Sequence, residues 1–138
     1  MPHLSIEYSP GLAPEVVERL CRAAHGAMTT AGIFPLAGIR VRAHRADVCI
    51  VADGLVENDF AAMTLSVGAG RTTDVLKAAG DRIFAAAQEV LSERLAEPHF
   101  ALSLDIRVSD PTLSWKDTPI HARLSPQGDE PTPEQKED

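Results

Sequence analysis

The chain has 138 residues, of which 44% are hydrophobic and 24% charged, and its formal net charge is −7. This length and composition predict one domain with a packed core. Most of the negative charge lies in the last fourteen residues, and the mildly acidic remainder offers no basic surface for nucleic acid.

The first half of the chain reads as strand, helix, strand. Residues 3–8 alternate between apolar and polar side chains, which predicts a half-buried strand. A helix is predicted to begin near Pro14, to carry an apolar stripe from Val17 to Ala31, and to end at Gly32. An extended stretch follows the loop "GIFPLAG" and runs from Ile39 to about Ala52. Its middle, "AHRAD", is either a hairpin turn or a bend between two strands.

The second half repeats the pattern. The stretch "FAAMTLSVG" predicts a strand, and Thr72 or Thr73 can cap the helix that follows. This helix carries a buried stripe from Leu76 to Leu91, and Pro98 lies just beyond it. A further strand, with alternating apolar residues, is predicted from Phe100 to Val108.

Two such halves predict an α+β fold. The β-α-β units, about residues 2–56 and 57–110, would form a four-stranded mixed sheet with both helices on one face. We expect another subunit on the other face, because the strands look too apolar for both faces to contact water. Residues 111–124 are predicted to form an arm, and residues 125–138 a disordered acidic tail.

Metal binding, disulfide formation and membrane insertion find no support in the sequence. Cys21 and Cys49 have no paired or zinc-ligand spacing, so we expect two reduced core residues. The five histidines show no ligand spacing either, and we expect no metal and no cofactor. No apolar run approaches the roughly 20 residues of a membrane span, and no signal peptide is seen. We therefore expect a cytoplasmic protein without a membrane partner.

The second residue is a candidate for proton transfer. A small residue at this position normally allows Met1 to be removed, which would leave Pro2 with a free secondary amine. Burial and neighbouring cations disfavour the charged form of an amine and lower its pKa. A pKa near the working pH suits a general base. This chemistry requires that Met1 be removed.

Two arginines could supply the neighbouring cations. Arg40 and Arg71 each follow a glycine-bearing segment at a predicted strand end, where the backbone can approach a ligand closely. Arginine keeps its charge when partly buried and can hold a carboxylate with two parallel hydrogen bonds. The alternative is that both are solvated charges at strand ends.

Several long segments resemble one known family. They are "MPHLSIEYS", "TTAGIFPLAGIRVRAH", "ADG" at 52–54, "MTLSVGAGR" and "ALSLDIRVSDPTLSWKDTPIHARL". Together they make residues 2–124 similar to the 5-carboxymethyl-2-hydroxymuconate isomerases of the tautomerase superfamily. The resemblance implies a tautomerase-like fold, a homotrimer with sites near subunit contacts, and a cofactor-free reaction on a small anionic dienol.

The resemblance also implies roles for particular residues. Pro2 matches the proline that transfers the proton, while Arg40 and Arg71 match arginines that bind or polarise the carboxylates of the substrate. We also expect Phe34, Arg42, His44 and Trp115 near the substrate. The implied reaction converts 5-carboxymethyl-2-hydroxymuconate to its 2-oxo-3-ene isomer during homoprotocatechuate (4-hydroxyphenylacetate) breakdown.

Two other functions remain open at this point. One is a tautomerase of a smaller 2-hydroxydienoate, such as 2-hydroxymuconate, or of a phenylpyruvate-type substrate. The other is a non-catalytic trimeric binding module that kept the scaffold. The presence of Pro2 together with Arg40 and Arg71 favours an enzyme over a binding module.

Overall fold

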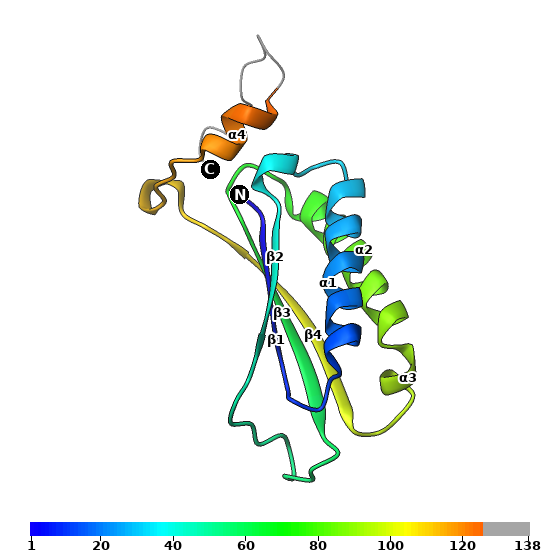
Figure 1. Ribbon diagram of the computed structural model, residues 1–138. Helices are drawn as coiled ribbons and strands as arrows, with labels where there is room; N and C mark the ends of the chain where they lie inside the picture. The colour runs from blue at the N-terminus through cyan, green and yellow to red at the C-terminus, as the bar shows by residue number, and fades with distance from the viewer. Residues whose placement is uncertain (126–138) are drawn as a thin grey trace.

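A computed structural model describes residues 1–125 of the chain (Figure 1). The predicted tail, 125–138, therefore lies outside the described residues except for Ser125. The elements are β1 (His3–Tyr8), α1 (Pro14–Thr30), η1 (Leu36–Gly38), β2 (Arg40–Arg45), β3 (Asp59–Val67), α2 (Thr73–Val90), α3 (Ser92–Leu95), β4 (Phe100–Val108), η2 (Pro111–Leu113) and α4 (Pro119–Leu124), where η marks a 3-10 turn.

The two long helices begin and end where the local sequence dictates. Pro14 is the first residue of α1, where its missing N–H costs no helical hydrogen bond. Thr72 caps α2, since its side chain accepts a hydrogen bond of 3.3 Å from the backbone N–H of Val75. Gly32 has a φ of +75°, the left-handed conformation that favours glycine just beyond a helix end.

The four strands form one sheet in the order β2-β1-β3-β4. β1 pairs with β2 in parallel, β3 pairs with β4 in parallel, and the two pairs meet antiparallel at β1 and β3. This arrangement is the predicted mixed sheet of two β-α-β units. Both long helices cover the same face of the sheet (Figure 1).

The core lies between this face and the two helices. Leu4 and Ile6 of β1 and Met63 and Leu65 of β3 are almost fully buried against apolar residues of α1 and α2. Burial of each large apolar side chain contributes about 1.5–3 kcal/mol, so these central strands anchor the domain. Neither cysteine belongs to this fully buried set: Cys21 and Cys49 are free thiols, and both are only half-buried.

The opposite face of the sheet corrects one expectation. The sequence suggests strands too apolar for both faces to contact water. In the structure, the strands direct most of their apolar residues toward the helices and leave the other face mostly polar. Apart from the apolar Phe60, Ala62 and Ala101, the open face carries His3, Ser5, Glu7, Arg40, Arg42, His44, Thr64, Ser66, Ser103, Asp105 and Arg107. Apolar character therefore gives no reason for a partner to cover this face.

The stretch after Ile39 is shorter as a strand than predicted. β2 ends at Arg45, and residues 46–58 form an irregular loop that leads to β3, so "AHRAD" contains the end of a strand and not a hairpin turn. Asn58 ties the loop together by donating hydrogen bonds of 2.6 Å to Asp53 Oδ1 and 3.1 Å to the carbonyl of Val51. Within residues 1–125, none of the helices has the length and apolar content that a membrane span requires.

Candidate active site

The sheet topology gathers three distant segments at one end. β1 and β2 are parallel, so Pro2, just before β1, lies beside Arg40 at the start of β2. β3 runs in the opposite direction, so its last residue, Val67, lies at this same end of the sheet. Arg71 follows four residues later. β4 also ends here, so the chain after Val108 starts from this end of the sheet.

Pro2 is held firmly at this end. Its side chain is fully buried, and its carbonyl accepts a hydrogen bond of 3.1 Å from the backbone N–H of Arg40. Gly38 of η1 packs directly against the ring: a Cβ atom at this position would lie only 2.9 Å from Pro2 Cδ. The position of Pro2 is thus fixed by β2 on one side and by η1 on another.

Both predicted arginines bind the loop between α1 and β2, which includes η1. Arg71 Nε donates a hydrogen bond of 3.1 Å to the carbonyl of Ile33, and its guanidinium stacks on the Phe34 ring, 5.1 Å from the ring centroid. Arg40 Nη1 donates a hydrogen bond of 2.8 Å to the carbonyl of Ala37. Phe34 is itself 8% exposed, so it fixes the plane of the Arg71 guanidinium.

The Met1 amine lies among several positive charges. Burial, followed by the charges of Lys116, Arg71 and Arg40, lowers the pKa of the Met1 amine from 8.0 to about 5. The Met1 amine is therefore mostly neutral at pH 7. Both predicted arginines are among the charges that act on this Met1 nitrogen, one residue before Pro2.

Lys116 belongs to the same group of cations and escaped the sequence analysis. It lies in the segment between η2 and α4, and its charge is a larger cause of the lowered Met1 pKa than that of either arginine. The sequence of this segment has no periodic pattern that would predict its path. Only the structure shows that the chain returns toward the N-terminus at α4, which brings Lys116 near the Met1 amine (Figure 1).

Arg42 and His44, predicted near the substrate, lie on the open face of the sheet. Arg42 Nη1 donates a hydrogen bond of 3.0 Å to His3 Nδ1. Burial, and then the charge of Arg42, lowers the pKa of His3, in keeping with a neutral ring that accepts this bond. His44 is exposed further along β2, opposite Glu7. Trp115 is 84% exposed in the single chain, next to Lys116.

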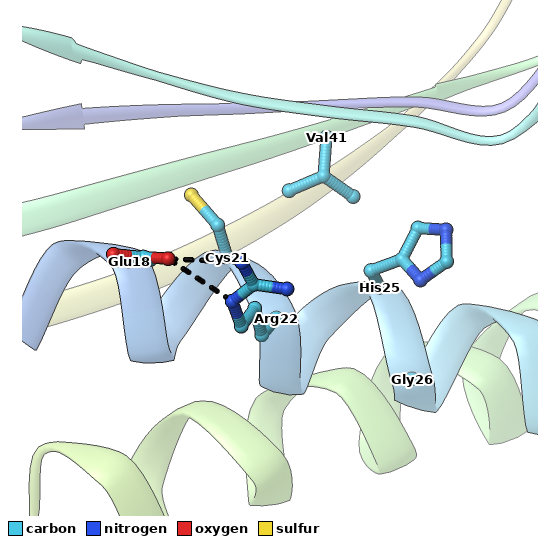
Figure 2. A pocket seen from close by; sticks show the side chains of 6 residues that line it. All are labelled: Glu18, Cys21, Arg22, His25, Gly26 and Val41. Carbon is cyan, nitrogen blue, oxygen red and sulfur yellow. Dashed lines mark hydrogen bonds and ion pairs between the residues drawn. The ribbon is translucent and has the colours of Figure 1, made fainter.

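A separate groove lies between α1 and β2 (Figure 2). It has a volume of about 490 Å³ and is lined by Glu18, Cys21, Arg22, His25, Gly26 and Val41. Glu18 and Arg22 form an exposed ion pair of 2.9 Å along the helix, and none of the predicted site residues lines the groove. We therefore place the candidate site at the N-terminal end of the sheet. Residues 1–125 contain no cluster of three side chains suited to a metal ion.

Comparison with known proteins gives a consistent result. Residues 2–124 match the model of the family described as 5-carboxymethyl-2-hydroxymuconate isomerase. The chain is 35% identical to the 5-carboxymethyl-2-hydroxymuconate Delta-isomerase of Escherichia coli over 125 residues, which cover 88% of this chain and 98% of that protein.

Solved structures agree. A crystal structure of a 5-carboxymethyl-2-hydroxymuconate isomerase from Deinococcus radiodurans R1 has a TM-score of 0.83 and 34% identity, covering 91% of this chain and 95% of its own. A fused 4-OT wild-type symmetric trimer has a TM-score of 0.52 and 24% identity, covering 75% of this chain and 84% of its own, and shares the fold.

Proposed function

This chain belongs to the 5-carboxymethyl-2-hydroxymuconate isomerase family, and we propose that it converts 5-carboxymethyl-2-hydroxymuconate to its 2-oxo-3-ene isomer with Pro2 as the proton carrier. One observation carries the assignment of the site. Burial, and then the charges of Lys116, Arg71 and Arg40, lowers the pKa of the Met1 amine, one residue before Pro2, from 8.0 to about 5. The substrate is an anion, so the same cations would attract it.

The reaction requires one group that acts first as a base and then as an acid. Once Met1 has been removed, the neutral Pro2 nitrogen takes the proton of the 2-hydroxyl group. The electron pair moves along the conjugated diene, so that a carbonyl forms at C2 and the double bond shifts to C3–C4. Protonated Pro2 then delivers a proton to C5, and the amine is neutral again.

The two arginines act on the substrate in this proposal. Arg40 and Arg71 hold the substrate carboxylates and stabilise the negative charge that develops on the 2-oxygen during transfer. Their hydrogen bonds to the loop at Ile33 and Ala37 fix both guanidinium groups before the substrate arrives. Arg42, His44 and Trp115 stay predictions as substrate contacts.

The proposed enzyme is a homotrimer in the cytoplasm. Three copies would associate, since a trimeric protein shares this fold and the arm exposes Leu113, Trp115 and Ile120 to solvent in the single chain. The reaction would take place in the cytoplasm during homoprotocatechuate breakdown. Light scattering that gives a mass of about one chain would contradict the trimer.

Mass spectrometry and two pairs of variants test the mechanism. The purified protein should lack Met1. Pro2→Ala and Arg40→Ala should each lower kcat/KM for 5-carboxymethyl-2-hydroxymuconate by about 100-fold or more, because each removes a group that acts in the transition state. The matched controls are Pro10→Ala in the exposed turn after β1 and Arg45→Ala at the other end of β2. Near-normal turnover by Pro2→Ala would end the proposal, and a preference of the wild type for 2-hydroxymuconate would reassign the substrate.

A further inference from the structure

The path of the arm places Lys116 over the candidate site. The chain leaves β4 at Val108, and α4 then packs against η1, the turn whose Gly38 contacts Pro2. In Figure 1, α4 lies next to the chain's N-terminus. The segment between η2 and α4, which carries Lys116, therefore ends beside η1, at the end of the sheet that holds Pro2.

The arm also orients Lys116 inward. Residues 114–118 alternate in exposure: Ser114, Lys116 and Thr118 are half-buried, while Trp115 and Asp117 are exposed. This period of two is that of an extended segment with one face against the protein. Lys116 Nζ donates a hydrogen bond to Ser114 Oγ on the same inner face. The long side chain thus points toward the protein with its position set by a neighbour.

The charge of the substrate explains why a third cation is needed. Muconate carries two carboxylates, and the carboxymethyl group at C5 adds a third, so the substrate is a trianion. Arg40 and Arg71 supply two positive charges at the site, and Lys116 supplies a third. Three cations that act on the one half-buried Met1 amine repel one another, and binding of a trianion would relieve this repulsion.

We propose that Lys116 binds the carboxymethyl carboxylate and thereby makes the enzyme selective for tricarboxylate over dicarboxylate dienols. The inference rests on the proposed function and deepens it. A lysine suits the task because its ammonium is a point charge on a flexible stem, and a carboxylate on a rotating methylene offers no fixed plane for a guanidinium to match. Lys116 is then a specificity-determining residue, while proton transfer stays with Pro2.

The test compares two substrates in matched variants. Lys116→Met keeps the length of the side chain and removes the charge, Lys116→Arg keeps the charge, and Lys77→Met on the exposed surface of α2 is the control. We expect Lys116→Met to lower kcat/KM for 5-carboxymethyl-2-hydroxymuconate by about 10- to 100-fold, as expected for loss of one charge-assisted hydrogen bond. The effect on 2-hydroxymuconate should stay within about threefold, and Lys116→Arg should restore most of the selectivity.

The outcomes separate this inference from the proposed function. An equal loss on both substrates, or no loss on either, would overturn the role of Lys116 while leaving the isomerase intact. Wild-type protein that acts on neither substrate would overturn the proposed function. In that case calorimetry with propane-1,2,3-tricarboxylate and glutarate decides the matter for Lys116: selective loss of tricarboxylate binding in Lys116→Met supports the inference, and unchanged binding contradicts it. If Lys116→Met melts at a lower temperature than wild type, Lys116→Gln repeats the comparison with a polar side chain.

Discussion

Gly38→Ala tests whether the exact position of Pro2 determines the rate. The added Cβ would lie 2.9 Å from Pro2 Cδ, whereas two carbon atoms normally stay about 3.5–4.0 Å apart. Either η1 or the Pro2 ring must therefore retreat by about 0.5–1 Å. Because the reacting nitrogen belongs to this ring, and a misplacement of about 1 Å can cost about 100-fold in rate, we expect kcat to fall by about 10- to 100-fold.

The same substitution should leave the fold in place. The φ of Gly38 is not in the left-handed region, so alanine can adopt this backbone conformation. Overpacking at the buried site should cost about 1–3 kcal/mol of the free energy of unfolding. Decay of the dienol absorbance gives kcat and KM, and a thermal melt gives the stability.

Gly26→Ala is the matched control. Gly26 lies inside α1, and an added Cβ there would meet no atom within 4 Å. Alanine should stabilise the helix by about 1 kcal/mol and leave kcat unchanged. If Gly38→Ala keeps the wild-type kcat and KM while its melt confirms the expected loss of stability, the contact between η1 and Pro2 does not control proton transfer.

Three further predictions concern acidity, stability and binding. The acid limb of the profile of kcat/KM against pH should have its midpoint well below 8, because burial and the neighbouring cations lower the pKa of the Met1 amine from 8.0 to about 5 and should act in the same direction on the Pro2 amine once Met1 is removed. The neutral amine, present above its pKa, is the base, so a midpoint at 8 or above would contradict this reasoning. Asp59→Asn should lower the free energy of unfolding by about 3 kcal/mol at pH 7 without changing kcat, because it removes one partner of the Arg94 ion pair of 2.6 Å at the far end of the sheet. Burial alone would raise the pKa of Asp59, but hydrogen bonds from Arg94 and Ser9 hold this pKa below 3.8. In urea melts, the difference in free energy of unfolding between wild type and Asp59→Asn should therefore be complete above pH 3.8 and disappear as the pH falls through the lowered pKa. Phe34→Leu should raise KM by about 2- to 5-fold by removing the ring under Arg71, and an unchanged KM would show that the stacking does not position this guanidinium.

The secondary structure was largely accessible from the sequence because its signals are local. Alternating apolar residues marked β1, β3 and β4, and Pro14, Gly32 and Thr72 marked helix ends through their own backbone and side-chain chemistry. The length of β2 was overestimated, since Val48 and Ile50 look like strand residues but are 88% and 86% exposed in the loop. Apolar side chains alone do not make a strand where no neighbouring strand offers hydrogen bonds.

The site was accessible only in part. Pro2, Arg40 and Arg71 were predicted from their positions next to strand ends, where the topology brings them together. The residues in contact with them were not. Nothing in the local sequence indicates that Gly38 packs against Pro2 or that the arm turns back to bring Lys116 to the amine. Both depend on how segments far apart in the chain pack, and periodicity carries no information about that.

The wall that η1 builds against Pro2 also sets an order of events during synthesis. An aminopeptidase must reach the bond between Met1 and Pro2, yet in the finished fold the Pro2 ring is fully buried and Gly38 lies against it. Trimming would then have to happen on the emerging polypeptide, before β1 joins the sheet. Copies that keep Met1 during rapid overproduction would remain inactive. The peptidase could then remove Met1 from them only after denaturation and refolding.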